Sequence, residues 1–247
     1  MEIILNENEK IEDLQCNELK IIQNKKWFCF GMDAVLLTNF CDVKNNSKIV
    51  DLGTGTGIIP ILLSGKRNYE KAIGIEIQEE VAEMAKRSVA LNNLQQKIEI
   101  LNIDLKDAFN YLEQNSFDAV ISNPPYKLTN SGIINPTDKK AISRHEIKCT
   151  LEDVISMASK LLKQYGRFYM VHRPDRLADI ICLLRKYKLE PKQIRFVYPK
   201  ISAKPNMLLI RSSKNGNPEL KFDPPLYIYG DDGKYTDDVY EIYGIDD

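Results

Sequence analysis

The sequence predicts an α/β protein whose central sheet is mostly parallel. Between residues 48 and 211, short apolar runs typical of buried strands alternate with segments in which apolar residues recur at helical spacing. The first of these runs, KIVDLG, leads through a glycine-rich turn into an apolar helix. Strict alternation of this kind indicates βαβ units, in which helices cover both faces of a parallel sheet.

The expected elements follow one another along the chain. Residues 14–30 hold two β-like runs around the turn-like segment 23–26, which predicts a β-hairpin, and residues 32–40 have helical spacing. Strands are expected at 48–53, 71–77, 97–104, 117–122 and 166–172, with helices at 57–65, 78–94, 105–114, 151–164 and 175–188. Two last strands near 192–211 flank the turn-like segment 202–206, which favours an antiparallel hairpin.

Composition indicates one large globular domain with small additions. The chain has 247 residues and 43% hydrophobic content, enough for a sizeable core. No run approaches the ~18 apolar residues of a membrane span, and the acidic N-terminus lacks the basic start of a signal peptide. The five cysteines form no CxxC pair, which argues against a disulfide framework or a zinc site. We therefore expect a cytoplasmic protein without a metal, and we expect a monomer.

The net charge of −1 conceals an asymmetry along the chain. Residues 160–221 carry 15 Lys and Arg residues against four acids, whereas residues 231–247 carry seven acids against Lys234. A basic region of this size suggests a polyanionic partner such as a nucleic acid. The alternative is a set of solvated helix faces and lysine-protected edge strands, and charge alone does not decide between the two.

A glycine-rich turn follows the first strand of the predicted sheet. Residues 51–57 (DLGTGTG) place Gly53, Gly55 and Gly57 at alternating positions, which lets the backbone turn tightly and approach a ligand closely. The pattern lacks the second half of the dinucleotide fingerprint, and Asp51 would oppose a pyrophosphate at the following helix. An acid at this place suits a cation instead, for instance an amino-acid ammonium. A plain tight turn is the alternative.

Two further acids end the next strands, at the same edge of the sheet. Glu76 ends the second strand, where it could accept both hydroxyls of a ribose diol. Asn102 and Asp104 end the third strand, where they could hydrogen-bond an adenine edge. Either acid could instead cap the helix that follows it. A ligand with an ammonium, a ribose and an adenine but no phosphate is S-adenosylmethionine, which is therefore the expected cofactor.

The ordered motifs of the chain resemble those of a known family. DLGTGTG, IEI and NID, followed by NPPY, are similar to the motifs of Rossmann-like S-adenosylmethionine-dependent methyltransferases that act on planar nitrogen. FGMDAVLL (30–37), SRHE (143–146) and HRPDRL (172–177) match, in order, the bacterial tRNA adenine-N6 methyltransferases that modify adenine 37 of valine tRNA. The likeness covers residues 14–211.

This resemblance implies a fold, a division of the chain and an activity. The implied fold is a mostly parallel seven-stranded sheet with a C-terminal antiparallel hairpin and an N-terminal β-hairpin extension. Residues 1–44 would pack a hairpin and a helix on the cofactor site, residues 45–214 would form the catalytic domain, and residues 215–247 would be an acidic tail. The implied activity is methyl transfer from S-adenosylmethionine to the N6 amine of an adenine in tRNA.

The NPPY motif explains why a buried strand would end in an amide, two prolines and an aromatic ring. Prolines cannot continue a ladder, so the strand stops there. The Asn123 side-chain oxygen and the Pro124 carbonyl would hold the hydrogens of an exocyclic amine and aim its lone pair at the methyl group. Pro124 and Pro125 fix the backbone, and Tyr126 would stack on the base, worth about 1–3 kcal/mol. A proline-terminated strand leading into a turn is the alternative.

Further candidate residues lie on loops and at element ends. Asp33 is by default an acid at a helix N-terminus, and the resemblance implies that its segment also covers the cofactor. The segment 127–148 is long enough to suggest a substrate loop, and the alternative is a surface lid with solvated charges. Its candidates for substrate binding are Lys139, Lys140, Arg144 and His145. His172 and Arg173 end a strand, where either phosphate contact or simple helix entry would explain them.

Other functions remain open from the sequence. A protein-glutamine methyltransferase would use the same NPPY motif on an amide nitrogen. Enzymes of that kind look as if they carry a sizeable helical domain ahead of the glycine turn. Here the 50 residues before Asp51 are typical of a hairpin and one helix. An rRNA amino-methyltransferase is a second alternative. A non-catalytic scaffold that binds S-adenosylmethionine or RNA is a third, and it would not require an intact NPPY motif.

Overall fold

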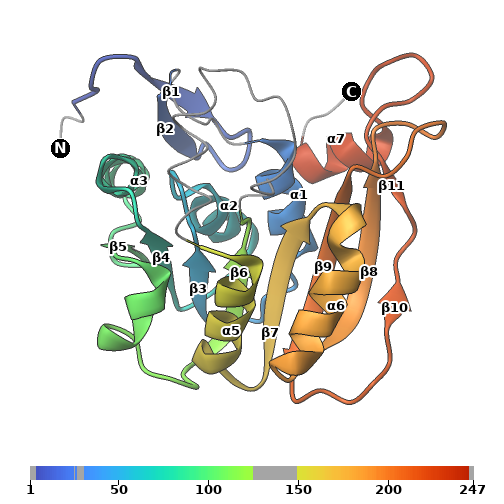
Figure 1. Cartoon of the computed structure of the whole chain (residues 1–247). Helices are drawn as coiled ribbons and strands as arrows, with labels where there is room; N and C mark the ends of the chain where they lie inside the picture. The colour runs from blue at the N-terminus through green and yellow to red at the C-terminus, as the bar shows by residue number, and fades with distance from the viewer. Residues whose placement is uncertain (1–3, 25, 27–30, 125–148, 245–247) are drawn as a thin grey trace.

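The computed structural model describes residues 4–24, 26, 31–124 and 149–244. Within these ranges a nine-stranded sheet forms the centre of the protein, and helices cover both of its faces (Figure 1). In chain order the strands are β3 (Lys48–Leu52), β4 (Lys71–Glu76), β5 (Ile98–Asn102), β6 (Phe117–Ser122), β7 (Leu162–His172), β8 (Leu189–Tyr198), β9 (Met207–Lys214), β10 (Lys221–Phe222) and β11 (Leu226–Tyr227).

The pairing of these strands confirms the predicted fold class. Their order is β10-β8-β9-β7-β6-β3-β4-β5, and β11 also pairs with β8. All pairs are parallel except β7 with β9 and β8 with β9, so β9 alone runs against its neighbours. The expected antiparallel hairpin is therefore β8–β9. Because β9 opposes both β7 and β8, the end of β8 lies at the same edge of the sheet as the end of β7.

Two apolar cores lie on opposite faces of the sheet. The first includes buried residues of α1 (Met32–Phe40), α2 (Ile58–Lys66) and α3 (Glu79–Leu91), and the second includes those of η1 (Leu105–Asn110), α5 (Leu151–Leu161) and α6 (Leu177–Lys186). Neighbouring residues of one strand divide between the cores: Ile49 of β3 belongs to the first and Val50 to the second. Burial on both faces explains why these strands are apolar runs rather than alternating patterns.

The N-terminal hairpin forms at a different place from the one predicted. Its strands are β1 (Glu9–Asp13) and β2 (Lys20–Asn24), and residues 14–19 connect them. The expected turn at 23–26 was wrong, because Gln23 and Asn24 are buried strand residues that pair with β1. The chain reverses instead where Gln15, Asn17 and Glu18 take left-handed backbone conformations, with φ values of 52°, 48° and 58°.

Several other boundaries differ from the expected ones in ways that packing explains. The segment expected as a helix over 105–114 is the short 3₁₀ helix η1, capped by Asp104. The helix expected over 151–164 ends at Leu161 because Leu162 is already paired with Phe117 of β6. The strands expected near 192–211 are longer, since β8 begins at Leu189 and β9 continues to Lys214.

The segment expected as an acidic tail is folded as far as residue 244. β10 and β11 pair with β8 on either side of Pro224 and Pro225, and these two prolines explain why the edge strand is split. The helix α7 (Asp237–Tyr243) then lies beside α1, as Figure 1 shows. Val239 and Ile242 of α7 are buried in the first core. No helix in the described ranges is long and apolar enough to cross a membrane.

Candidate active site

The candidate residues meet at the edge of the sheet where the parallel strands end. The register pairs Leu52 of β3 with Ile75 of β4 and with Ser122 of β6, and it pairs Glu76 with Asn102 of β5. The turns that follow these strands therefore begin side by side. β3 connects to β4 on one side, while β6 flanks it on the other, so a crevice at a reversal of strand order is expected here.

The glycine turn leaves open space in front of its backbone. Gly53, Gly55 and Gly57 have φ values of +76°, +56° and +82°, which only glycine adopts without strain. A Cβ atom placed on Gly53 or Gly55 would meet nothing within 4 Å. These glycines are therefore required by the course of the turn and not by a crowded neighbour. A ligand can approach the backbone closely at this point.

Asp51 lies under this turn with its side chain buried. Its Oδ2 accepts a hydrogen bond of 2.6 Å from Thr54 Oγ1, whereas its buried Oδ1 has no hydrogen-bond partner in the part of the chain that the structure describes. Burial, together with the nearby charge of Glu76, raises the pKa of Asp51 to about 7, against the lowering effect of the Thr54 hydrogen bond. A buried carboxyl oxygen without a partner suits a cationic group of a ligand.

Glu76 joins the end of β4 to the glycine turn. Its side chain is buried, Oε2 accepts from the Gly55 N–H at 3.1 Å, and Oε1 accepts from the Gln78 N–H at 2.9 Å. Gln78 is the N-cap residue of α3, so Glu76 also serves the start of that helix. Oε1 also accepts from the Gln78 side-chain Nε2 at 3.5 Å, so the lone pair that remains for a hydroxyl is on Oε2. Its contact with a ribose stays a prediction.

Asn102 ends β5 beside Glu76, and Asp104 follows two residues later. The Asn102 Nδ2 group donates to the Glu76 backbone carbonyl at 2.9 Å, which ties the ends of β4 and β5 together. Asp104 caps η1 by accepting the Lys106 N–H at 3.0 Å. The capping alternative for Asp104 is thus confirmed, and its contact with an adenine stays a prediction.

The first residues of the NPPY motif stand at the end of β6. The strand end is fixed by Ser122, whose hydroxyl donates to the Leu52 carbonyl of β3 at 2.8 Å. Asn123 follows, and its Nδ2 group donates a 3.0 Å hydrogen bond to Asp33 Oδ2 at the start of α1. Pro124 is buried. The structure therefore brings Asp33 to the amide predicted to bind the methyl acceptor.

Part of the predicted substrate site lies outside the described residues. This holds for two residues of the NPPY motif and for all four candidates of the loop that follows it: Pro125, Tyr126, Lys139, Lys140, Arg144 and His145.

His172 and Arg173 lie at the end of β7, on the same edge. His172 is buried and its Nδ1 accepts the Arg173 N–H at 2.8 Å, and burial followed by the charge of Arg176 lowers its pKa to about 4. A neutral, buried imidazole is poorly suited to bind a phosphate, which favours the alternative that His172 serves the entry into the following helix. Arg173 forms a two-point ion pair with Asp175, at 2.7 and 3.1 Å. Contact of Arg173 with a phosphate stays a prediction.

Two buried polar side chains, one of them in the site, were missed in the sequence. Thr54 donates a hydrogen bond to Asp51. Its position, three residues after an acid within a glycine turn, could have predicted this contact. Gln23 is fully buried in β2, and both polar atoms of its side chain lack hydrogen-bond partners within the described ranges. Nothing in its local pattern distinguished Gln23 from a turn residue.

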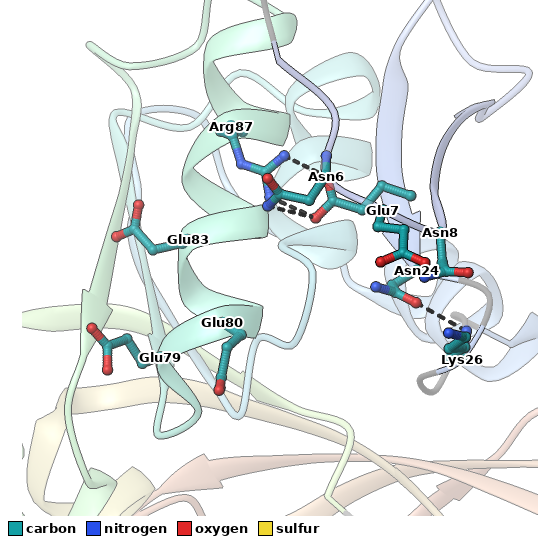
Figure 2. A pocket seen from close by; sticks show the side chains of 10 residues that line it. Asn6, Glu7, Asn8, Asn24, Lys26, Glu79, Glu80, Glu83 and Arg87 are labelled. Carbon is teal, nitrogen blue, oxygen red and sulfur yellow. Dashed lines mark hydrogen bonds and ion pairs between the residues drawn. The ribbon is translucent and has the colours of Figure 1, made fainter.

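A separate hollow of about 680 Å³ lies between the N-terminal segment and α3 (Figure 2). Its lining includes Glu79, Glu80 and Glu83 of α3, which makes the hollow acidic. None of the predicted site residues lines it. Arg87 at its rim forms a two-point ion pair with Glu9, at 2.6 and 2.7 Å, which attaches the hairpin to α3. This hollow therefore marks the contact between the N-terminal hairpin and α3, and its negative charge disfavours binding of a phosphate.

The fold and the edge of the sheet together define a class of protein. The open glycine turn, the unpartnered buried oxygen of Asp51 and the strand-end carboxylate of Glu76 fit the amino-acid and ribose parts of S-adenosylmethionine. These features belong to the Rossmann-like methyltransferases that use S-adenosylmethionine as their methyl donor. The described residues contain no group of three or more His, Cys, Asp or Glu that could hold a metal ion.

The chain belongs to the methyltransferase small domain family, whose match spans residues 30–181. Relatives named tRNA1(Val) (adenine(37)-N6)-methyltransferase occur in several bacteria. The relative from Bacteroides thetaiotaomicron is 29% identical over 193 residues, 77% of this chain and 79% of its own length. The relative from Porphyromonas gingivalis strain W83 is 29% identical over 220 residues, 86% of each chain.

Solved structures support the fold. A predicted O-methyltransferase from Agrobacterium tumefaciens superimposes with a TM-score of 0.70 at 24% identity, over 86% of this chain and 96% of that one. Geranyl diphosphate C-methyltransferase from Streptomyces coelicolor, in complex with S-adenosyl-L-homocysteine, gives a TM-score of 0.57 at 12% identity, over 74% and 80%. At these identities the likeness shows the Rossmann-like methyltransferase fold alone. The predicted class of enzyme and its cofactor, S-adenosylmethionine, are confirmed by the family.

Proposed function

We propose that this methyltransferase modifies the exocyclic N6 amine of an adenine in tRNA, at adenine 37 beside the anticodon of a valine tRNA. The relatives that carry this activity in their names match most of this chain and most of their own length. The observation that carries the proposal is the position of Asn123. It follows β6 directly, next to the turn that begins at Gly53 after β3, and its amide donates to Asp33.

The chemistry of this position suits an aromatic amine. When bound, S-adenosylmethionine supplies an electrophilic methyl group on a sulfonium. The N6 amine of adenine is a poor nucleophile because its lone pair is delocalised into the ring. In this proposal the Asn123 amide oxygen and the Pro124 carbonyl accept its two hydrogens, which favours a pyramidal nitrogen and stabilises its developing positive charge. No strong general base is needed, because the proton can leave after the transfer.

Each part of the ligand is assigned to one element of the edge. Asp51 faces the ammonium, Glu76 accepts the ribose hydroxyls, and Asp104 approaches the adenine of the cofactor. Tyr126 stacks on the target base, and the lysines and arginines near the edge hold phosphates of the tRNA. The protein acts on its tRNA in the cytoplasm and as a monomer.

An anticodon-loop adenine is the physically favoured target for this chemistry. In a duplex the N6 amine is paired, so the enzyme must take the base out of a stack. Unpaired loop bases are the least costly to extrude, and they are the usual targets of sequence-specific RNA recognition. The protein-glutamine and rRNA alternatives are not favoured, because the relatives are named for a tRNA base.

Labelled S-adenosylmethionine tests the proposal directly. The protein is offered valine tRNA, the same tRNA with guanine at position 37, an rRNA fraction and a protein fraction. We expect label only in the unaltered tRNA, recovered as N6-methyladenosine by nucleoside mass spectrometry. Label in a protein glutamine or in rRNA, with none in tRNA, would refute the assignment.

A further inference from the structure

Asp33 connects the start of α1 to the catalytic amide across 90 residues of sequence. It is the second residue of the helix, and its two carboxylate oxygens have different partners. Oδ1 accepts the Ala34 N–H at 2.9 Å, and Oδ2 accepts from Asn123 Nδ2 at 3.0 Å. The sequence reading assigned Asp33 to the cofactor. In the structure it contacts Asn123, the residue proposed to bind the acceptor base.

This contact decides which way the Asn123 amide points. The oxygen and the NH₂ group of an asparagine side chain have nearly the same shape, so packing alone distinguishes them poorly. A carboxylate can only accept hydrogen bonds, so the group facing Asp33 must be the NH₂. The Asn123 oxygen is then on the opposite side of the planar amide from Asp33. That is the orientation an acceptor for the N6 hydrogens requires.

The carboxylate is held in place by the surrounding structure. Leu36 and Leu37 bury the middle of α1 in the first core, so the start of the helix has a fixed position. A Cβ atom on Gly31, the N-cap residue, would lie 2.7 Å from Asp33 Oδ1. Glycine at position 31 therefore leaves the room that the Asp33 side chain occupies. The charge of Asp33 also acts on Tyr243 of α7, whose pKa is raised to about 12 by burial, then by Tyr235 and Asp33.

We propose that Asp33 is a positioning residue for methyl transfer, which orients the Asn123 oxygen toward the N6 amine and supplies a negative charge behind the amide. This inference rests on the proposed function. Hydrogen bonds in a chain polarise one another, so a carboxylate on the NH₂ side makes the amide oxygen a stronger acceptor. The positive charge that develops on N6 is then stabilised through the Asn123 amide by Asp33. The effect grows toward the transition state and raises kcat.

Three variants separate this role from that of an ordinary helix-terminal acid. Asp33→Ala removes the acceptor and the charge, and we expect kcat to fall on the order of 100-fold. Asp33→Asn can still accept from Asn123 but carries no charge, so a loss of about tenfold is expected. Gly31→Ala leaves the carboxylate in the chain but displaces it, and kcat should fall without any change of charge.

Asp153 provides a matched control. It is also an aspartate in the first turn of a helix, where it completes a capping box with Thr150 at the start of α5. Asp153→Asn should lower the melting temperature without lowering kcat. S-adenosylhomocysteine affinity, measured by calorimetry, should be unchanged in all four variants. The KM for tRNA should also be unchanged.

A double substitution tests whether the two residues act as a pair. Asn123→Asp places two carboxylates against each other and should nearly abolish transfer. Adding Asp33→Asn restores one donor and one acceptor at the contact, now with the carboxylate facing the amine. We expect the double variant to be at least about tenfold more active than Asn123→Asp alone, as for coupled neighbours.

The outcomes are distinct. Wild-type methylation of tRNA is measured first, so failure of the proposed function is seen before any variant is compared. A normal kcat with a lowered melting temperature in Asp33→Ala would make Asp33 a helix cap only. A loss of S-adenosylhomocysteine affinity with normal kcat would make it a cofactor ligand. A double variant no more active than Asn123→Asp would also overturn the proposal.

Discussion

The two halves of the sheet end differently at the edge that carries the site. On the side of β3 and β4, the charged side chains are acids and they are buried, as Asp51 and Glu76 show. On the side of β7, β8 and β9, the charged side chains are mainly basic and they face solvent. The side chains of Lys200 and Lys204, in the turn between β8 and β9, are exposed and form no hydrogen bond or ion pair in the described ranges.

This difference matches two opposite demands of the reaction. A small cationic cofactor is bound best where water is excluded, because a buried carboxylate interacts strongly at a low dielectric constant. A large polyanion is bound best by solvated lysines and arginines. When these side chains neutralise phosphates, counterions are released, and this release favours binding. Asn123 directly follows β6, at the boundary between the two halves. The boundary is where the methyl group must pass from one ligand to the other.

The largest effect is expected at this boundary. Asn123→Ala should lower methyl transfer by at least ~100-fold, because it removes the acceptor that stabilises charge on the amine. Its affinity for S-adenosylhomocysteine should remain normal. Glu76→Ala should instead weaken that affinity through lost charged hydrogen bonds worth about 1.5–3 kcal/mol. Calorimetry on both variants measures the separation, and equal losses of affinity would show that the boundary does not divide base from cofactor.

A smaller effect is expected from Asp51, through pH. Its pKa is raised from 3.8 to about 7, chiefly by burial, so between these values the folded protein holds a proton that the unfolded chain releases. The free energy of unfolding should therefore fall as pH rises through this window, by up to about 1.4 kcal/mol per pH unit, and stay level above it. Denaturant titrations from pH 5 to pH 8 measure the slope.

Asp51→Asn is the control for this slope and also tests the acidic half. An amide cannot titrate, so the decrease in stability between pH 5 and pH 7 should become smaller in this variant. In the wild type a cationic ligand favours the ionised carboxyl, so affinity for S-adenosylmethionine should rise from pH 6 to pH 8. An identical pH dependence in both proteins would show that Asp51 does not carry the titration.

The sequence predicted the acidic half better than the basic one. Strand–turn–helix units are local, so the glycine turn, the strand-end acids and the end of β6 could be placed from apolar runs and turn residues. The hairpin was misplaced because Gln23 and Asn24 are turn-like in composition, yet pairing with β1 buries them. The contact of Asp33 with Asn123 could not be predicted at all, since it joins residues that only the tertiary fold brings together.

The C-terminal segment shows the same limit. Its acidic composition suggested a tail, and nothing local indicated that residues 226–227 would pair with β8. The hydrophobic signal was present in Val239 and Ile242, but seven residues of helix are too few for a periodic pattern to be distinctive. Packing against α1 and β11 supplies the stability that helix propensity does not.

A moderate effect is expected from the basic half. Lys200→Glu with Lys204→Glu should weaken tRNA binding by about tenfold or more and reduce the slope of log affinity against log salt by about 0.7 to 0.9 for each lost phosphate contact. The matched control is Lys44→Glu, which makes the same change of charge at an exposed lysine ahead of β3, on the opposite edge of the sheet. Filter binding at several salt concentrations measures both. Equal slopes in the double variant and the wild type would remove this turn from the tRNA interface.

The smallest effect is expected where the two kinds of charge meet. Asp238 of α7 pairs with Arg195 of β8 at 3.3 Å, so an acid of the C-terminal segment partly neutralises the basic half. The Asp238 side chain is 61% exposed, and exposed pairs of this kind contribute about 0–1 kcal/mol, so Asp238→Asn should hardly change the melting temperature. Releasing Arg195 should strengthen tRNA binding slightly at low salt, with the difference disappearing at high salt as screening increases.

Asp231→Asn, at an exposed acid with no ion pair in the described part of the chain, is the control for a general change of charge. If both variants gain affinity equally, the segment repels RNA through its overall charge; if only Asp238→Asn gains, it acts by covering Arg195.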